Sequence, residues 1–256
     1  MSGVEWTKAR LAETVAAFAL LTRLPVGLIP IHWTRELRHA AWAYPLAGAA
    51  VGLIGGAIYW IVHGLGVPPV LAAIFAIFAM ILATGALHED GLVDAADGLG
   101  GKSPEDRLAI MRDHRIGTYG AIALVLSLAI RIGAVALLSE SSLVIAALIA
   151  AGAASRASAT ALMAVLPHAR DDGLSRAVGL ATRQDAVMAV AITLAIAWLM
   201  LSFGLSLGVV IVTAITTAIA GLLALARLGG QTGDVLGAAC QLGECAALTL
   251  FVATLR

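Results

Sequence analysis

The sequence predicts an all-α protein that crosses a membrane several times, and two observations carry this prediction. The 256 residues are 61% hydrophobic and only 12% charged, with a mean hydropathy of +0.97, whereas an ordinary soluble domain carries about 25% charged residues. The hydrophobic residues also gather in stretches of about 20, the length at which an α-helix crosses a bilayer. We therefore expect a polytopic, integral membrane helical bundle, formed as a single domain over residues 1–256.

Seven stretches are long and apolar enough, or nearly so, to be spanning helices. In chain order they are 41–63, 69–87, 118–138, 143–166, 186–203, 205–226 and 236–255. Upstream of them, the apolar run 11–21 is too short to span comfortably. We expect that run to form an N-terminal interfacial helix, with an eighth span as the alternative. Glycine and alanine are frequent in the stretches, which favours close helix packing.

The basic side chains fall into every second gap between these stretches. They precede the first stretch, where Arg35 and Arg38 lie, and they occupy the gaps before 118–138, before 186–203 and before 236–255. The gaps on the opposite side contain only Glu140 as a charged residue. Because loops rich in lysine and arginine stay in the cytosol, we predict that the charged face is cytosolic.

An acidic run interrupts the apolar sequence at 88–98, which reads His-Glu-Asp-Gly-Leu-Val-Asp-Ala-Ala-Asp-Gly. Asp90, Asp94 and Asp97 are spaced i, i+4 and i+7, so they share one face if the run is helical. Like charges at this density repel one another unless a cation neutralises them. Mg²⁺ binds one or two protein carboxylates together with substrate phosphate oxygens. The run therefore predicts a magnesium site that faces a pyrophosphate.

Two alternatives stay open for this run. It is also typical of a solvated helix end that pairs with nearby arginines. His88 fits three roles, as an interfacial ring first, and otherwise as a general base or a metal ligand.

A short amphipathic helix is predicted after the acidic run, over 104–114. Ser103 has the type and position of its N-cap, and proline follows at the first helical position. Beyond this helix, Arg112 and Arg115 are suited to phosphate binding, and Gly117 lets the backbone approach a ligand. Plain anchoring of the cytosolic face by positive charge is the alternative.

A glycine-rich turn precedes the last stretch, at 229–238. Gly230, Thr232 and Gly233 offer backbone N–H groups to an anion at a helix start. Asp234 is a further candidate metal ligand, or the cap of that helix.

Three ionisable residues lie inside predicted spans. Glu244 lies about 12 Å along its helix and Arg156 about 15 Å along its own. An ionisable residue at such depth is a functional candidate, so Glu244 is a candidate metal ligand and Arg156 a candidate substrate ligand. A purely structural ion pair is the alternative. Arg131 lies nearer the far face, and we expect it to be structural and to snorkel outward.

Three segments together resemble the signatures of the cobalamin synthase family, also called adenosylcobinamide-GDP ribazoletransferase or cobalamin-5'-phosphate synthase. They are 88–98, 110–120 and 230–238, and the likeness extends to 22–26 (Thr-Arg-Leu-Pro-Val) and 44–48 (Tyr-Pro-Leu-Ala-Gly). The resemblance covers essentially the whole chain in order. Glu89 departs from the pattern, which has an apolar residue there, so no role is assigned to it.

The resemblance implies a magnesium-dependent transferase of the bacterial cytoplasmic (inner) membrane. Such an enzyme transfers the phosphocobinamide moiety of adenosylcobinamide-GDP to alpha-ribazole or alpha-ribazole 5'-phosphate. It releases GMP and forms adenosylcobalamin or its 5'-phosphate. The substrates and the lipid bilayer are the implied partners, and nucleic acid is not. A homo-oligomer, or an association with other corrinoid-assembly enzymes, stays open.

This chemistry fits the residues. A ribazole hydroxyl attacks the phosphorus that carries the cobinamide arm, and negative charge builds up on the phosphate oxygens as GMP leaves. The candidates to take the hydroxyl proton are His88, Asp94, Asp97 and Asp113. The candidate substrate-binding residues are Arg112, Arg115, Gly117, Arg156, Gly230, Thr232 and Gly233. The candidate metal ligands are Asp90, Asp94, Asp97, Asp234 and Glu244.

Two other functions fit part of the sequence. A CDP-alcohol phosphotransferase shares the D-x-x-D-G start at 94–98, but its motif continues with an Ala-Arg pair and two spaced aspartates, where this chain reads Leu-Gly-Gly-Lys. A transporter would carry ionisable groups on toward the far side, and there the sequence has only Arg131 and Glu140.

Overall fold

The computed structural model describes residues 3–26, 37, 39–113 and 115–255, and over these residues it contains helices and no β-strand. The predicted all-α class is therefore confirmed. The elements are α1 (Gly3–Leu21), the short 3₁₀ helix η1 (Ala41–Ala43), α3 (Tyr44–Gly64), α4 (Pro69–Thr84), α5 (Leu87–Gly98), α6 (Pro104–Ile110), α7 (Thr118–Leu138), α8 (Ser141–Val165), α9 (Leu174–Val178), α10 (Arg183–Met200), α11 (Phe203–Leu228) and α12 (Gly233–Leu255).

Six helices within the described ranges are long and apolar enough to cross a membrane: η1 with α3, then α7, α8, α10, α11 and α12. A seventh crossing results if α4 and α5, which are bent by 88° relative to each other, count as one broken span. This agrees with the expected number of about seven.

The break between α4 and α5 corrects the predicted second span, which ran from 69 to 87. Gly85 and Ala86 both adopt left-handed backbone, with φ of 64° and 59°, and a helix cannot continue through two such residues. As a result α4 ends at Thr84, and the acidic run forms a helix of its own that leaves the direction of the span.

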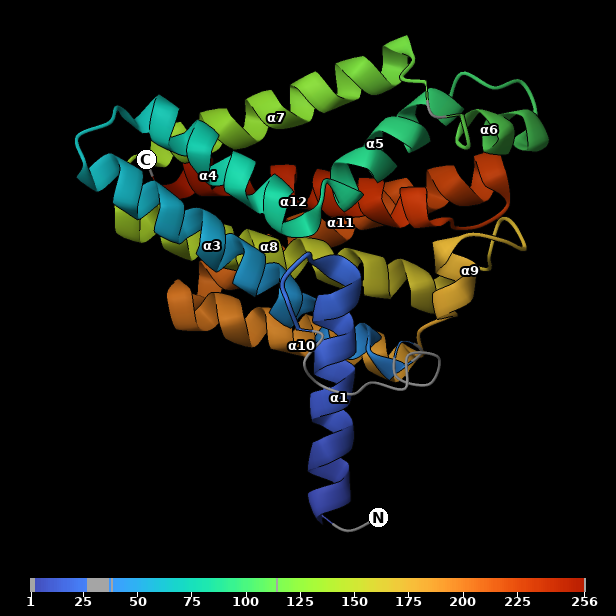
Figure 1. Cartoon of the computed structure of the whole chain (residues 1–256), viewed down its shortest axis with the longest axis horizontal. Helices are drawn as coiled ribbons and strands as arrows, with labels where there is room; N and C mark the ends of the chain where they lie inside the picture. The colour runs from blue at the N-terminus through green and yellow to red at the C-terminus, as the bar shows by residue number, and fades with distance from the viewer. Residues whose placement is uncertain (1–2, 27–36, 38, 114, 256) are drawn as a thin grey trace.

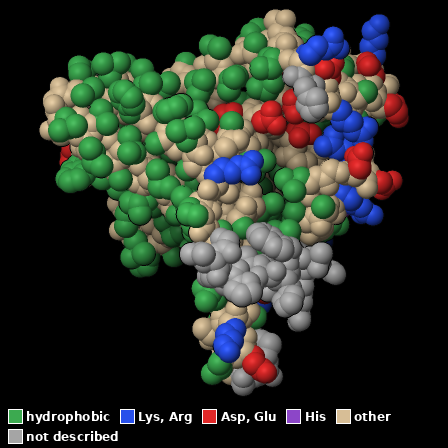
Figure 2. All heavy atoms as spheres, in the orientation of Figure 1, with side chains coloured by type: hydrophobic (Ala, Val, Ile, Leu, Met, Phe, Trp, Pro, Cys, Tyr) green, Lys and Arg blue, Asp and Glu red, His purple; other side chains and the backbone are tan. Residues whose placement is uncertain are grey.

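Successive spans run in alternate directions, so the charged gaps before α7, α10 and α12 meet at one end of the bundle (Figure 1). We call this the polar end; it consists of α5, α6, α9 and the adjoining termini of the long helices. Figure 2 shows charged side chains gathered there, while hydrophobic side chains cover much of the remaining surface on the visible face. This agrees with the predicted separation of charge. Arg35 and Arg38 lie outside the described residues.

Helix α1 differs from the spans in sequence and in direction. It carries Lys8, Arg10 and Glu13, is not among the helices apolar enough to cross, and runs across the long axis of the bundle (Figure 1). Its C-terminal half packs on η1 and α3, where Glu13 accepts a 2.7 Å hydrogen bond from the Trp42 indole. This arrangement favours the interfacial alternative over an eighth span.

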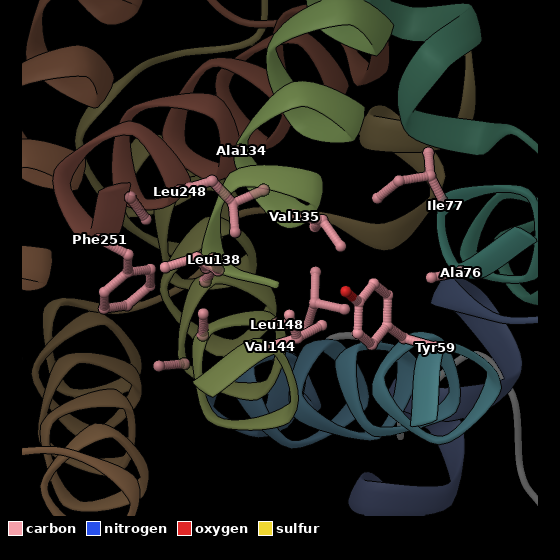
Figure 3. Packing of buried hydrophobic residues seen from close by; sticks show 14 of the residues in the cluster. Tyr59, Ala76, Ile77, Ala134, Val135, Leu138, Val144, Leu148, Leu248 and Phe251 are labelled. Carbon is pink, nitrogen blue, oxygen red and sulfur yellow. The ribbon is translucent and has the colours of Figure 1, made fainter. Parts of the chain in front are cut away.

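The core lies where α3, α4, α7, α8 and α12 meet, and Figure 3 shows its side chains converging from these helices. Tyr59 is fully buried there and donates a 2.9 Å hydrogen bond to the Ser139 carbonyl. Helices α3 and α8 touch through their backbones, because a Cβ on Gly48 would collide with the carbonyl of Gly152. The expected close packing through small residues is thus present.

Candidate active site

Two cavities adjoin at the polar end. The first, here called the polar cavity, encloses about 1070 Å³, part of it open to solvent. The second, here called the apolar cavity, has an empty volume of about 730 Å³, part of it likewise open to solvent. Asp90, Arg170 and Asp234 line both cavities, and we call these three residues the junction. The charged residues that line the polar cavity are Glu89, Asp90, Asp94, Arg112, Arg115, Arg170 and Asp234.

A close crossing of α5 and α12 brings the acidic run beside the glycine-rich turn. A Cβ on Gly91 would lie 3.0 Å from the Asp234 carbonyl oxygen, and a Cβ on Gly237 would lie 3.3 Å from the Cα of Gly91. Only glycines allow two helix backbones to approach so closely. The two motifs that the sequence predicts to act together therefore share one site.

The three aspartates of the acidic run do not share one environment. Asp90 and Asp94 line the polar cavity, but Asp97 does not. Its two oxygens accept hydrogen bonds from the backbone N–H groups of Gly117 (2.7 Å) and Gly120 (2.8 Å). A carboxylate in this position stabilises the start of α7.

The predicted metal set is corrected accordingly. Over the described part of the chain, no group of three or more His, Cys, Asp or Glu side chains is close enough to hold a metal ion. Asp97 instead positions α7. Its carboxylate accepts from the Gly117 N–H and lies so close that a Cβ on Gly117 would collide with it. The carboxylates left for a metal ion in the polar cavity come from Asp90, Asp94 and Asp234, with Glu89 beside them.

Glu244 and Arg156 form a buried ion pair inside the bundle. Arg156 Nη1 lies 2.7 Å from Glu244 Oε2, and Arg131 Nε lies 2.9 Å from Glu244 Oε1. Both carboxylate oxygens thus face guanidinium groups, and neither Glu244 nor Arg156 lines the two cavities. This geometry supports the structural ion pair, because a buried charge of this kind needs an opposite charge as partner. The roles of metal ligand and substrate ligand stay predictions.

Arg131 extends the pair into a network, here called the buried charge network: Glu89, Arg131, Arg156, Gln241 and Glu244. Arg131 Nη1 lies 2.7 Å from Glu89 Oε1, which also accepts a 2.9 Å hydrogen bond from Gln241. All five residues are at most 6% exposed. The expected outward snorkelling of Arg131 is therefore wrong, since its partners hold it inside.

Glu89 is a site residue that the sequence reasoning missed. Its second oxygen, Oε2, is buried without a hydrogen-bond partner, and the residue lines the polar cavity. One signal in the sequence could have identified it: Glu89 is a carboxylate at a position where the family pattern has an apolar residue. Its partner Arg131 lies 42 residues away, a separation that no local pattern connects.

Arg170 is the second missed residue. Its Nη2 lies 3.3 Å from Asp234 Oδ2 and its Nε lies 3.4 Å from Asp172 Oδ1, while Nη1 is buried with no partner. A desolvated guanidinium N–H without an acceptor is suited to a phosphate oxygen. In the sequence Arg170 is only one of several basic residues in its gap.

Arg112 and Arg115 line the polar cavity from its exposed side. Arg112 lies 2.7 Å from Asp172, and this hydrogen bond holds the pKa of the Asp172 carboxyl below its usual value. Arg115 pairs with Asp113 at 2.6 Å, which raises the pKa of Arg115. Asp113 gives both oxygens to this pair and does not line the cavity. Its predicted role as proton acceptor therefore has no support from the geometry.

The helix that leads to this cluster starts as predicted and ends early. Ser103 caps it by accepting a hydrogen bond from Asp106 N at 3.2 Å. The helix ends at Ile110 and not at 114, and His114 lies outside the described residues.

The glycine-rich turn is anchored to the loop after α8. Gln231 N donates to the Pro167 carbonyl at 2.8 Å, and Ala169 N donates to the Gln231 carbonyl at 2.9 Å. Gly230 is packed against this loop, since a Cβ there would lie 2.9 Å from Ala169 N. Thr232 caps α12 by accepting from Val235 N.

Gly230 and Thr232 are buried and line neither cavity, so their predicted contact with substrate stays a prediction that the cavities do not support. Gly233 lines the apolar cavity and Asp234 lies at the junction. His88 is buried at the wall of the apolar cavity, 3% exposed, and its Nδ1 has no hydrogen-bond partner.

Comparisons with known proteins find similar proteins over nearly the whole chain. A model of the cobalamin-5-phosphate synthase family matches residues 13–252. Similar proteins named adenosylcobinamide-GDP ribazoletransferase include one from Bradyrhizobium diazoefficiens, 44% identical over 98% of this chain and 97% of the relative. One from Azorhizobium caulinodans is 44% identical over 93% and 94%, and one from Brucella anthropi is 36% identical over 96% and 98%. No solved structure matches the chain.

Proposed function

The chain belongs to the cobalamin-5-phosphate synthase family, and from this premise we propose how its polar end works as an adenosylcobinamide-GDP ribazoletransferase. The reaction joins the phosphocobinamide moiety of adenosylcobinamide-GDP to alpha-ribazole or its 5'-phosphate, and GMP leaves. One new bond forms between a ribazole hydroxyl oxygen and phosphorus, and the bond from that phosphorus to the GMP oxygen breaks.

The observation that carries the proposal is the junction itself. Two cavities of different chemistry meet at Asp90, Arg170 and Asp234. A transfer between two substrates requires two adjoining sites that present the reacting atoms to each other. The charged polar cavity is suited to the pyrophosphate of the donor, and the neighbouring cavity is then free for the acceptor.

We propose that Arg170 binds the phosphate that is attacked. Its Nη1 is desolvated and unpaired, and it lies at the junction, where the attacked phosphorus must be. Arg112 and Arg115 line the same cavity and add positive charge at its mouth. Guanidinium groups aimed at developing negative charge lower the barrier of phosphoryl transfer.

We propose that His88 accepts the proton of the attacking ribazole hydroxyl. Its Nδ1 is buried without a partner at the wall of the apolar cavity, and the residue lies two positions before Asp90 on α5. A neutral imidazole nitrogen accepts a proton from an attacking hydroxyl. The next residue, Glu89, is held in place by Arg131 and Gln241. It lines the neighbouring polar cavity.

Magnesium dependence is part of the proposal. Hard carboxylate oxygens from Asp90 and Asp94 line the polar cavity, and Mg²⁺ takes one or two protein carboxylates together with phosphate oxygens and water. The donor set therefore fits without a preformed group of three ligands. Mg²⁺ bound there would neutralise charge on the phosphate oxygens.

We further propose that the polar end faces the cytosol from the bacterial cytoplasmic membrane. The lysines and arginines of the gaps before α7, α10 and α12 collect at this end (Figure 2), and basic loops stay on the cytosolic side. This orientation gives a nucleotide-bearing substrate direct access to both cavities.

The direct test uses the purified protein in detergent or liposomes with adenosylcobinamide-GDP, alpha-ribazole 5'-phosphate and MgCl₂. We expect GMP release together with formation of adenosylcobalamin 5'-phosphate. Asp94→Asn should reduce the rate about 100-fold or more, because the polar cavity loses a carboxylate charge. Glu140→Gln, at the opposite end of the bundle, is the matched control and should leave the rate unchanged. Ion flux into liposomes without GMP release would instead indicate a transporter.

A further inference from the structure

The apolar cavity has a largely hydrophobic wall, which the transfer chemistry alone does not require. Six helices and the loop before α9 contribute to its wall, and side chains such as Leu21, Leu87, Met163 and Val178 make most of it apolar. The space inside it that water-sized spheres can occupy is about 120 Å³, so it suits a small group.

Two polar atoms in this wall are buried and unpartnered. They are the Tyr44 hydroxyl and His88 Nδ1, on side chains that are 2% and 3% exposed. Buried polar groups in proteins are nearly always hydrogen-bonded, and a lone one carries a cost in stability. Two of them around one cavity indicate a ligand that brings a small number of hydrogen-bonding atoms and is otherwise apolar.

The two substrates offer three bulky groups, and these differ in polarity. The corrin ring is wider than such a cavity, and guanine presents donors and acceptors along a whole edge, which apolar walls would leave unpaired. The benzimidazole base of ribazole is flat and carries a single free ring nitrogen. Of the three groups, only this base matches an apolar wall with one hydroxyl donor.

On the basis of the proposed function, we propose that the apolar cavity binds the benzimidazole base of the ribazole acceptor, with Tyr44 donating a hydrogen bond to its free ring nitrogen. The ribose then lies toward the junction, and its hydroxyl faces His88 and the phosphate held by Arg170. Tyr44 is thereby a specificity-determining residue for the acceptor. It stands at the first position of α3, and its side chain is buried.

The test measures KM for each of the two substrates with the full-length protein in detergent. Tyr44→Phe should raise KM for alpha-ribazole about 5- to 10-fold, as expected for the loss of one hydrogen bond, and leave KM for adenosylcobinamide-GDP unchanged. Ala159→Phe places a ring in the cavity and should raise KM for alpha-ribazole more than 30-fold, about the effect of removing a good ligand contact. Ala161→Phe is the matched control, because Ala161 lies on the same helix and does not line this cavity.

A binding measurement keeps this inference distinct from the proposed function. Titration calorimetry with alpha-ribazole alone, in the absence of donor, should show binding to the wild type and to Ala161→Phe but not to Ala159→Phe. If the wild type releases no GMP in the complete assay, the proposed function fails while the calorimetry still tests the cavity. If both cavity variants change KM for adenosylcobinamide-GDP and not for alpha-ribazole, the cavity holds the nucleotide end of the donor and the inference is overturned.

Discussion

Arg131 Nη1 lies 2.7 Å from Glu89 Oε1 in the interior of the bundle, and through Glu244 this pair is continuous with Arg156. The network contains two carboxylates and two guanidinium groups, so its net charge is zero. It connects α5, which carries the acidic run, to α7, α8 and α12. The wall of the polar cavity is therefore attached to three spans by buried ion pairs.

This arrangement predicts a strong coupling between Glu89 and Arg131. Glu89→Ala should destabilise the protein by about 3–5 kcal/mol, because Arg131 is left with one partner fewer inside the bundle. The double variant with Arg131→Ala restores charge balance, since Glu244 keeps Arg156. Its loss of stability should therefore be smaller than the sum of the two single losses. Thermal unfolding in detergent measures all four proteins, and additive losses would contradict the network.

The contact of Asp97 with the start of α7 predicts that Gly117 and Gly120 tolerate no side chain. In Gly120→Ala, the new Cβ collides with the Asp97 carboxylate and approaches Val93, so we expect a loss of about 1–3 kcal/mol. Gly133→Ala lies on the same helix in open space and should be neutral or slightly stabilising. Equal melting temperatures for the two variants would show that the carboxylate does not fix the helix start.

The close crossing of α5 and α12 predicts a loss of activity when either glycine is enlarged. A Cβ on Gly91 would lie 3.0–3.2 Å from the backbone of Asp234 and Gly237, so Gly91→Ala must push α5 away from the junction. We expect GMP release to fall at least 10-fold, because small displacements in a positioned site are costly. Gly204→Ala, at a position with open space around it, serves as control. Wild-type activity in Gly91→Ala would mean that the crossing does not align the site.

We predict that the stability of the protein depends on pH through His168, in the loop that anchors the glycine-rich turn. Burial, and next the charge of Arg176, lower the pKa of His168 below its ordinary value of 6.5, against the opposite effect of Asp171. Its neutral Nδ1 contacts the Gln231 amide and the Ser175 hydroxyl. Because the unfolded chain binds the proton more readily, this contribution to stability is present above pH 6.5 and is lost as the pH falls.

Melting curves in detergent between pH 7.5 and 5 measure this effect. The wild type should lose stability on acidification, and His168→Gln should lose less, since its amide has no proton to gain in this range. Identical slopes for the two proteins would exclude His168 as the titrating group.

Much of the fold and part of the site could be predicted from local sequence. The apolar stretches identified the spans, because their length must match the bilayer. Ser103 identified a helix start, and the acidic run with the glycine-rich turn identified the site, since both patterns carry their chemistry within a few residues.

The rest depends on contacts between distant segments. The bend at Gly85 and Ala86 comes from two left-handed residues, one of which is alanine and gives no signal in the sequence. The pairing of Glu89 with Arg131, and of Glu244 with both arginines, exists only once four helices have packed. Arg170 looked like one basic residue among several until the fold placed its unpaired nitrogen at the junction.

The central claim is that the donor phosphate binds at the junction through Arg170. The most direct measurement is the steady-state kinetics of Arg170→Gln, with GMP release followed at varied adenosylcobinamide-GDP and saturating alpha-ribazole 5'-phosphate. We predict a fall in kcat/KM for the donor of about 100- to 1,000-fold, with a well-folded protein. The matched control Arg183→Gln, exposed at the start of α10 and outside both cavities, should behave as wild type. Unchanged donor kinetics in Arg170→Gln would contradict the account.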